Sequence, residues 1–193
     1  MNLPNKISLS RIFLVPVVMF FYLEGFFEYG KIIAFLLFVI AVSTDFVDGM
    51  IARRTNQVTS LGKFLDESAD KLLTTAVLVM LLADNIFTSQ VFGIIAVFSI
   101  LARDQVVGFV RRLCAGKGII IAADKLGKIK TILLDVALSL FMLLAVCDKY
   151  PVFPDELLDI VAIITYLIFL SGLVMNIISG INYCIKNKDC FKD

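Results

Sequence analysis

The chain has 193 residues, of which 60% are hydrophobic, and its mean hydropathy is +0.94. Soluble domains are usually about 45–50% apolar, so this composition excludes an ordinary soluble domain and indicates a membrane protein. The net charge of only +1 gives no sign of a nucleic-acid-binding surface.

Predicted membrane spans begin close to the N-terminus. The opening MNLPNKISLSR lacks the cleavage site of a signal peptide, so we expect it to remain in the mature protein, with residues 1–10 forming a short interfacial segment. A spanning helix needs about 20 mainly apolar residues. Six stretches come close to this length, and together they predict a single all-α membrane domain over 1–193: 8–28, 32–54, 62–84, 91–113, 126–147 and 157–181.

The basic residues predict how these spans are oriented. If the N-terminus is cytoplasmic, fourteen lysines and arginines fall on the cytoplasmic side and two, Lys31 and Lys149, fall on the opposite side. Cytoplasmic loops of membrane proteins carry the excess of positive charge. We therefore expect both termini to face the cytoplasm.

Acidic residues interrupt the apolar pattern at the second and third spans. Asp45 and Asp48 close the second span, and Asp66 and Asp70 open the third. A carboxylate at membrane depth is costly unless it is paired or bound to a metal, so such residues indicate a functional site. Each pair shares one helix face, and the short turn between the spans would place the two pairs side by side.

Four converging carboxylates repel one another unless cations lie between them. Carboxylate oxygens favour hard divalent ions such as Mg²⁺ or Mn²⁺. Two such ions would suit phosphoryl transfer. Gly49 and Ala52 lie beside the Asp45 and Asp48 face, where small residues allow either a close ligand approach or close helix packing, and Arg53 could pair with a phosphate.

The stretch DFVDGMIARRTNQVTSLGKFLDESAD reads D-x2-D-G-x2-A-R-x8-G-x3-D-x3-D. It resembles the signature of the CDP-alcohol phosphotransferase family at every fixed position. Those positions are Asp45, Asp48, Gly49, Ala52, Arg53, Gly62, Asp66 and Asp70.

This resemblance implies a six-helix membrane enzyme, usually a homodimer, in the cell membrane with its active site open to the cytoplasm. It implies that Asp45, Asp48, Asp66 and Asp70 hold two Mg²⁺ or Mn²⁺ ions, with Asp70 as the catalytic base for the acceptor hydroxyl. Nucleotide and diphosphate would be bound near a second set of signature residues, namely Gly49, Ala52, Arg53 and Gly62.

Segments outside the signature resemble bacterial phosphatidylglycerophosphate synthases. They are NLPNKISLSR, ARDQVVGFVRR, LGKIKT and SGINYCIK. The chain departs from that pattern at Asp104, where Glu is usual, and at Glu67-Ser68, where Pro-Leu is usual. The implied substrates are CDP-diacylglycerol and glycerol 3-phosphate, with membrane lipids around the protein.

A phosphorylated acceptor needs cations beside the carboxylates. The motifs point to Arg111, Lys128 and Lys130, although these charges also fit a purely topological role. Because Lys128 and Lys130 are two residues apart, they should diverge on a regular helix. Arg103, next to Asp104, is either a structural ion pair or part of the acceptor pocket.

At the N-terminus, Asn5 and Arg11 either line the entry for nucleotide or lipid or anchor the chain at the membrane surface. The four cysteines form no C-x-x-C pair and the chain has no His, so we expect no zinc site and treat the cysteines as ordinary apolar or interfacial residues.

Three alternatives remain open. The first is a sister enzyme that uses inositol phosphate, serine or phosphatidylglycerol as acceptor. The second is a membrane prenyltransferase, which would release pyrophosphate instead of CMP. The third is a divalent-cation transporter that uses the aspartates for selectivity.

Overall fold

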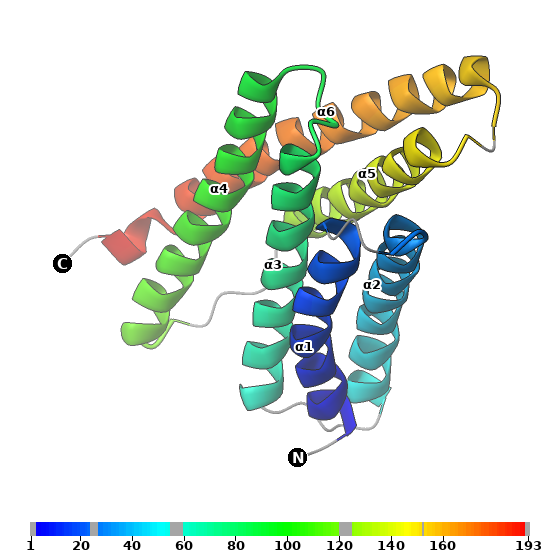
Figure 1. Ribbon diagram of the computed structural model, residues 1–193. Coiled ribbons are helices and arrows are strands. Elements are labelled where there is room, and N and C mark those ends of the chain that lie inside the picture. Colours follow the sequence, from blue (N-terminus) through cyan, green and yellow to red (C-terminus); the bar gives the residue numbers. More distant parts are fainter. Residues whose placement is uncertain (1–2, 24–26, 55–59, 120–124, 152, 192–193) are drawn as a thin grey trace.

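A computed structural model describes residues 3–23, 27–54, 60–119, 125–151 and 153–191, and these are almost entirely helical (Figure 1). The predicted all-α class is confirmed, since the described residues contain no strand. The helices are α1 (Leu3–Leu23), α2 (Gly30–Arg54), α3 (Ser60–Ala83), α4 (Gln90–Gly116), α5 (Lys125–Lys149), α6 (Asp155–Lys186) and a 3-10 helix, η1 (Lys188–Phe191).

The first helix differs most from the prediction. We expected a span over 8–28 preceded by a separate interfacial segment, but α1 runs without a break from Leu3 to Leu23. Pro4 lies in the first turn of α1, where a missing N–H costs nothing. Asn5 and Arg11 are 5% and 3% exposed, so one face of this part of the chain packs against the protein, while Lys6 and Ser10 stay exposed.

Four of the described helices are long and apolar enough to cross a membrane: Asn5–Leu23, Gln90–Gly116, Leu126–Lys149 and Asp155–Lys186. The apolar part of α2, Gly30–Thr44, is shorter. The first turns of α3 carry the charged residues Asp66, Glu67, Asp70 and Lys71, which lower its hydropathy. A multi-pass membrane protein is therefore supported, and the count of six spans stays a prediction.

Helices α1, α2 and α3 lie side by side, with α1 packed against both of the others, while α5 and α6 form a second closely packed pair (Figure 1). Contacts of α5 with α2 and α3 join the two groups, and α4 packs mainly against α6. Gly172 of α6 allows the close approach of α5, since a Cβ there would lie 2.9 Å from Cδ2 of Leu134. Small residues commonly permit such helix contacts in membranes.

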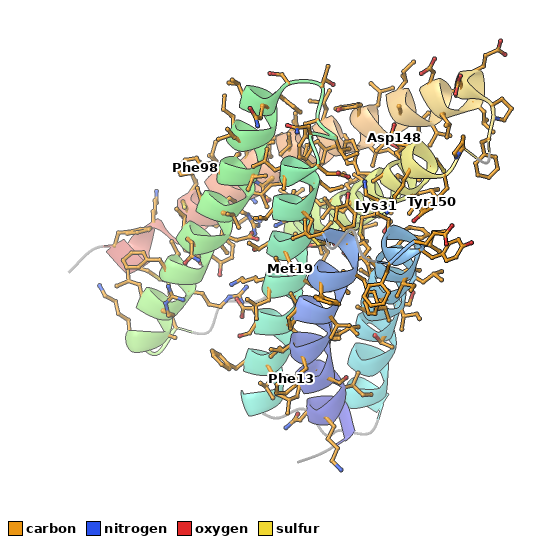
Figure 2. The ribbon with its side chains drawn as sticks, in the orientation of Figure 1. Phe13, Met19, Lys31, Phe98, Asp148 and Tyr150 are labelled. Atoms are coloured by element: carbon orange, nitrogen blue, oxygen red, sulfur yellow. A yellow bond between two sulfur atoms is a disulfide. The ribbon has the colours of Figure 1, made fainter. Side chains whose placement is uncertain are left out.

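The interior is filled by aliphatic and aromatic side chains. The rings of Phe87, Phe141 and Phe169 pack with centroids 5.4–5.6 Å apart and join the segment between α3 and α4 to α5 and α6. Other large apolar side chains point outward: Phe13 and Phe98, labelled in Figure 2, are 67% and 71% exposed. Such an apolar exterior is what contact with lipid tails requires.

One end of the bundle is tied by polar contacts among the ends of α1, α2 and α3. Oδ2 of Asp84 accepts hydrogen bonds from the Tyr22 hydroxyl at 2.9 Å and from the Lys31 ammonium at 2.6 Å. The Tyr150 hydroxyl donates to the backbone carbonyl of Glu28. Lys31 and Tyr150 are seen near one another at this end in Figure 2. This end lies opposite the start of α3, which carries the signature aspartates.

Two cysteines that we expected to be ordinary residues are joined. Cys114, near the end of α4, forms a disulfide with Cys190 of η1, with a Cα–Cα distance of 5.3 Å. Cys147 and Cys184 are free. The prediction was wrong for the first pair because the two cysteines are 76 residues apart in the chain, and only the packing of α4 against α6 and η1 brings them together.

Candidate active site

The signature residues lie near the end of α2 and near the start of α3. Asp45 and Asp48 fall in the last turns of α2, and Asp66 and Asp70 fall in the first turns of α3. The four aspartates thus fall near the end of one helix and near the start of the next, and their convergence in space stays a prediction. Some predicted site residues have side chains outside the described part of the structure: Asp45, Asp48, Gly49, Ala52 and Arg53.

Asp66 is held by the first helix. The Arg11 guanidinium donates from Nη2 to Oδ1 of Asp66 at 2.7 Å. Arg11 is buried, whereas the Asp66 side chain is 49% exposed. Arg11 therefore fixes one carboxylate oxygen from the protein side, and the rest of the carboxylate faces outward. The sequence left Arg11 either at the entry for nucleotide or lipid or as an anchor at the membrane surface, and the structure places it against Asp66.

Asp70 follows Asp66 by one helical turn and is half-buried, as is Gly62. The spacing of four residues puts both carboxylates on one face of α3. No group of three potential metal ligands is present among the residues whose side chains are described, a set that leaves out Asp45 and Asp48. Asp66 and Asp70 are the two signature aspartates whose side chains are described. Both offer carboxylate oxygens, which suit a hard divalent cation.

Glu67 links α3 to α4. Its Oε1 accepts from the Lys71 ammonium at 2.7 Å, and its Oε2 accepts from Nη1 of Arg111 at 3.0 Å. All three side chains are 38–47% exposed. Arg111, predicted to bind the acceptor phosphate, is thus paired with a carboxylate that directly follows a signature aspartate.

A second polar cluster lies between α4, α5 and α6. Asp104 accepts on Oδ1 from Nη1 of Arg103 at 3.0 Å and from Nζ of Lys130 at 2.9 Å. Arg103 also donates from Nη2 to the hydroxyl of Ser179 at 3.0 Å. We call these four residues the Asp104 cluster. It makes Arg103 part of an ion pair and at the same time brings it next to Lys130, a predicted acceptor residue.

The two lysines of the LGKIKT segment diverge as their spacing predicts. Both lie in the first two turns of α5, but Lys130 is 6% exposed and Lys128 is exposed. Lys130 and Arg111 belong to different clusters, since they pair with Asp104 and Glu67 respectively. The structure therefore does not bring the three predicted acceptor residues into one contact.

Sequence reasoning missed two partners in these clusters. Ser179 was noticed only as part of a motif, although it bonds Arg103 across 76 positions of the chain. Glu67 was noticed only as a departure from the family pattern, although an acidic residue four positions before Lys71 on a predicted helix signals an ion pair. This spacing could have predicted the contact of Glu67 with Lys71, but not its contact with Arg111.

Comparison with known proteins agrees with this arrangement. The model of the CDP-alcohol phosphatidyltransferase family matches residues 1–177. A Bacillus subtilis protein named CDP-diacylglycerol–glycerol-3-phosphate 3-phosphatidyltransferase is 36% identical, over 99% of this chain and 97% of its own length.

Two further relatives carry the same name. One from Rickettsia felis is 40% identical over 74% of this chain and 75% of its own length. One from Salmonella choleraesuis is 36% identical over 72% of this chain and 75% of its own length. Together with the helical membrane fold and the aspartates at the start of α3, these matches show that the chain belongs to the CDP-alcohol phosphatidyltransferase family.

Proposed function

We propose that this protein transfers the phosphatidyl group of CDP-diacylglycerol to sn-glycerol 3-phosphate, releasing CMP and phosphatidylglycerophosphate. The observation that carries the proposal is the 36% identity over almost the full length of a relative named for this reaction. The complete eight-residue signature and the placement of Asp66 and Asp70 on one face of α3 support it.

The proposed site takes two Mg²⁺ or Mn²⁺ ions, held by Asp45, Asp48, Asp66 and Asp70. The support is the all-oxygen donor set and the partial exposure of the Asp66 carboxylate. Ions bound there supply positive charge that neutralises the diphosphate and the leaving oxygen. Arg11 orients Asp66 from behind, which is the usual role of a residue that hydrogen-bonds a metal ligand.

In the proposed reaction, Asp70 removes the proton from the acceptor hydroxyl. The hydroxyl oxygen then forms a bond to the phosphorus that bears diacylglycerol, and the bond from this phosphorus to the bridging oxygen breaks, so CMP leaves. With no His in the chain, a carboxylate is the natural base. The nucleotide side of the site is assigned to the remaining signature residues, namely Gly49, Ala52, Arg53 and Gly62.

For the acceptor phosphate we assign Lys130, with Arg103 beside it, and Arg111 and Lys128 nearer the surface. Lys130 and Arg103 both donate to Oδ1 of Asp104, so the two cations lie close enough together to bind one phosphate group. Charge-assisted hydrogen bonds from Lys and Arg are the usual means of holding a phosphate. The sequence pointed to Arg111, Lys128 and Lys130 together, whereas this assignment gives Lys130 and Arg103 the main part in binding the acceptor phosphate.

The same proposal places the protein in the cytoplasmic membrane, with both termini and the active site on the cytoplasmic side. The excess of basic residues at the predicted cytoplasmic ends supports this orientation. A lipid substrate can then keep its acyl chains in the bilayer while its head group reaches the aspartates. Asn5 belongs to the entry of this site, and the homodimeric state is proposed from family resemblance.

The decisive assay is CMP release from CDP-diacylglycerol by the purified protein in detergent, with Mg²⁺ and a panel of acceptors. We expect release with glycerol 3-phosphate, none with serine, and loss of activity on chelation. Asp70→Asn should reduce the rate by about 10²–10⁴-fold, the usual contribution of a general base. Turnover with only another alcohol would refute the acceptor, and no metal-dependent CMP release with any acceptor would refute the transferase proposal.

A further inference from the structure

The Asp104 cluster contains a carboxylate shared by two cations. A single oxygen, Oδ1 of Asp104, accepts from Lys130 at 2.9 Å and from Arg103 at 3.0 Å. The side chains of Lys130 and Arg103 are only 8% and 16% exposed. Asp104 and Arg103 belong to α4 and Lys130 belongs to α5, so this oxygen links side chains of two helices that both pack against α6.

Burial makes the shared carboxylate important for Lys130. An ammonium withdrawn from water within an apolar helix bundle is costly unless an anion compensates it. Without Asp104, two cations would be left beside each other in a buried place, where their repulsion is little screened. The expected response is a movement of the long Lys130 side chain away from Arg103.

Arg103, by contrast, is fixed on several sides. Nη2 bonds Ser179 of α6 at 3.0 Å. Glycines border it on α5 and α6: a Cβ at Gly180 would lie 2.9 Å from its Cγ, and a Cβ at Gly127 would lie 3.5 Å from its Nη2. These contacts hold the Arg103 guanidinium in place without help from Asp104. The position of the Lys130 side chain, in contrast, depends on Asp104.

The cluster keeps a positive charge of one, since Arg103 and Lys130 contribute two and Asp104 removes one. Nε of Arg103 is also buried with no hydrogen-bond partner within the described part of the chain. A positive charge together with an unused donor favours the approach of an anion. Asp104 thus organises the two cations without cancelling their attraction for a phosphate.

We propose that Asp104 is a positioning residue: it holds Lys130 beside Arg103 so that both can bind the phosphate of the acceptor alcohol. This inference rests on the proposed function, because that function supplies the phosphorylated acceptor. Asp104 itself does not contact the substrate in this scheme. It acts through the location of the Lys130 ammonium.

A purely electrostatic role for Asp104 predicts the opposite result. If Asp104 only placed a negative charge near the phosphate, its neutralisation would strengthen acceptor binding. If Asp104 positions Lys130, its neutralisation weakens acceptor binding, because the lysine is no longer held. The sign of the change in the acceptor KM therefore separates the two roles.

The experiment compares Asp104→Asn and Asp104→Glu with the wild-type protein. Asp104→Asn should raise the KM for glycerol 3-phosphate about tenfold to a hundredfold, the range expected for a lost hydrogen bond to a charged group. The KM for CDP-diacylglycerol should stay within about twofold of wild type, since no assigned nucleotide residue is touched. Asp104→Glu keeps the carboxylate and should restore most of the acceptor affinity.

Asp84→Asn is the matched control. Asp84 also accepts a lysine and a second donor on one oxygen, at 2.6 and 2.9 Å, and its side chain is 28% exposed against 21% for Asp104. It lies at the opposite end of the bundle. We expect it to lower thermal stability without changing the KM for glycerol 3-phosphate.

Calorimetric titration of glycerol 3-phosphate into the same proteins tests the inference without turnover. An unchanged or stronger affinity in Asp104→Asn, or equal weakening by Asp84→Asn, would overturn the positioning role. Wild-type protein that binds glycerol 3-phosphate but releases no CMP would refute the proposed function alone. Wild-type protein that binds neither glycerol 3-phosphate nor inorganic phosphate would overturn both.

Discussion

Gly180 offers a direct test of the contact between α6 and Arg103. In Gly180→Ala, the added Cβ would lie 2.9 Å from Cγ of Arg103. Ordinary contact begins at 3.4 Å, so one side must move by about 0.5 Å. The Cγ atom is near the base of the side chain, and the far end of Arg103 is bonded to Ser179 at 3.0 Å. The movement therefore stretches that hydrogen bond.

The energetic cost follows from two opposing effects. Overpacking a close contact costs about 1–3 kcal/mol, and replacing a helical glycine by alanine returns about 0.5–1 kcal/mol. We expect a net loss of about 1–2 kcal/mol in the free energy of unfolding. Thermal unfolding in detergent should show a midpoint several degrees below wild type, with a raised KM for glycerol 3-phosphate.

Gly116→Ala serves as the control, because nothing lies within 4 Å of a Cβ at that position. A double-mutant cycle identifies the contact: in an Arg103→Ala background, which removes Cγ, Gly180→Ala should no longer destabilise the protein and should keep only the small gain of replacing a helical glycine by alanine. The reasoning would be refuted if Gly180→Ala matched Gly116→Ala in stability, or if its cost persisted without Arg103.

Two further predictions concern the other ion pairs of the site. Arg11→Met should raise the Mg²⁺ concentration needed for half-maximal CMP release about 10–100-fold, which is the usual effect of losing a residue that orients a metal ligand. An unchanged Mg²⁺ requirement would show that Arg11 does not orient Asp66. Glu67→Gln should change the free energy of unfolding by less than about 1 kcal/mol, because its pairs with Lys71 and Arg111 are partly exposed to solvent. A larger loss of thermal stability would show that this link between α3 and α4 is structural.

Most of the helical framework could be predicted from hydropathy alone. The ends of α2, α3 and α5 fall within about two residues of the predicted spans, because charged and polar residues mark where each apolar run stops. The start of α1 was missed because residues 1–10 were expected to form an interfacial segment, and the burial of Asn5, Ser8 and Arg11 was missed with it. They are buried because α1 packs against α2 and α3 and Arg11 reaches Asp66.

The site was predicted less completely than the fold. Spacing along one helix, as for Asp66 and Asp70 or for Lys128 and Lys130, follows from the geometry of the α-helix and can be read from sequence. Contacts between helices that are distant in the chain cannot be read from sequence in this way. The pairing of Lys130 with Asp104 depends on how α4 and α5 each pack against α6, and no periodicity in either segment encodes that distance.

The Cys114–Cys190 disulfide turns the second half of the chain into a covalent ring that contains α5 and α6. Membrane proteins are removed from the bilayer by proteases that grip a free end and pull. With the bond intact, a pull on the C-terminus passes through Cys190 to α4 instead of unwinding α6 from its last turn. Cytosolic thiols are normally kept reduced, so this ring would stay closed only where that membrane face meets an oxidising environment.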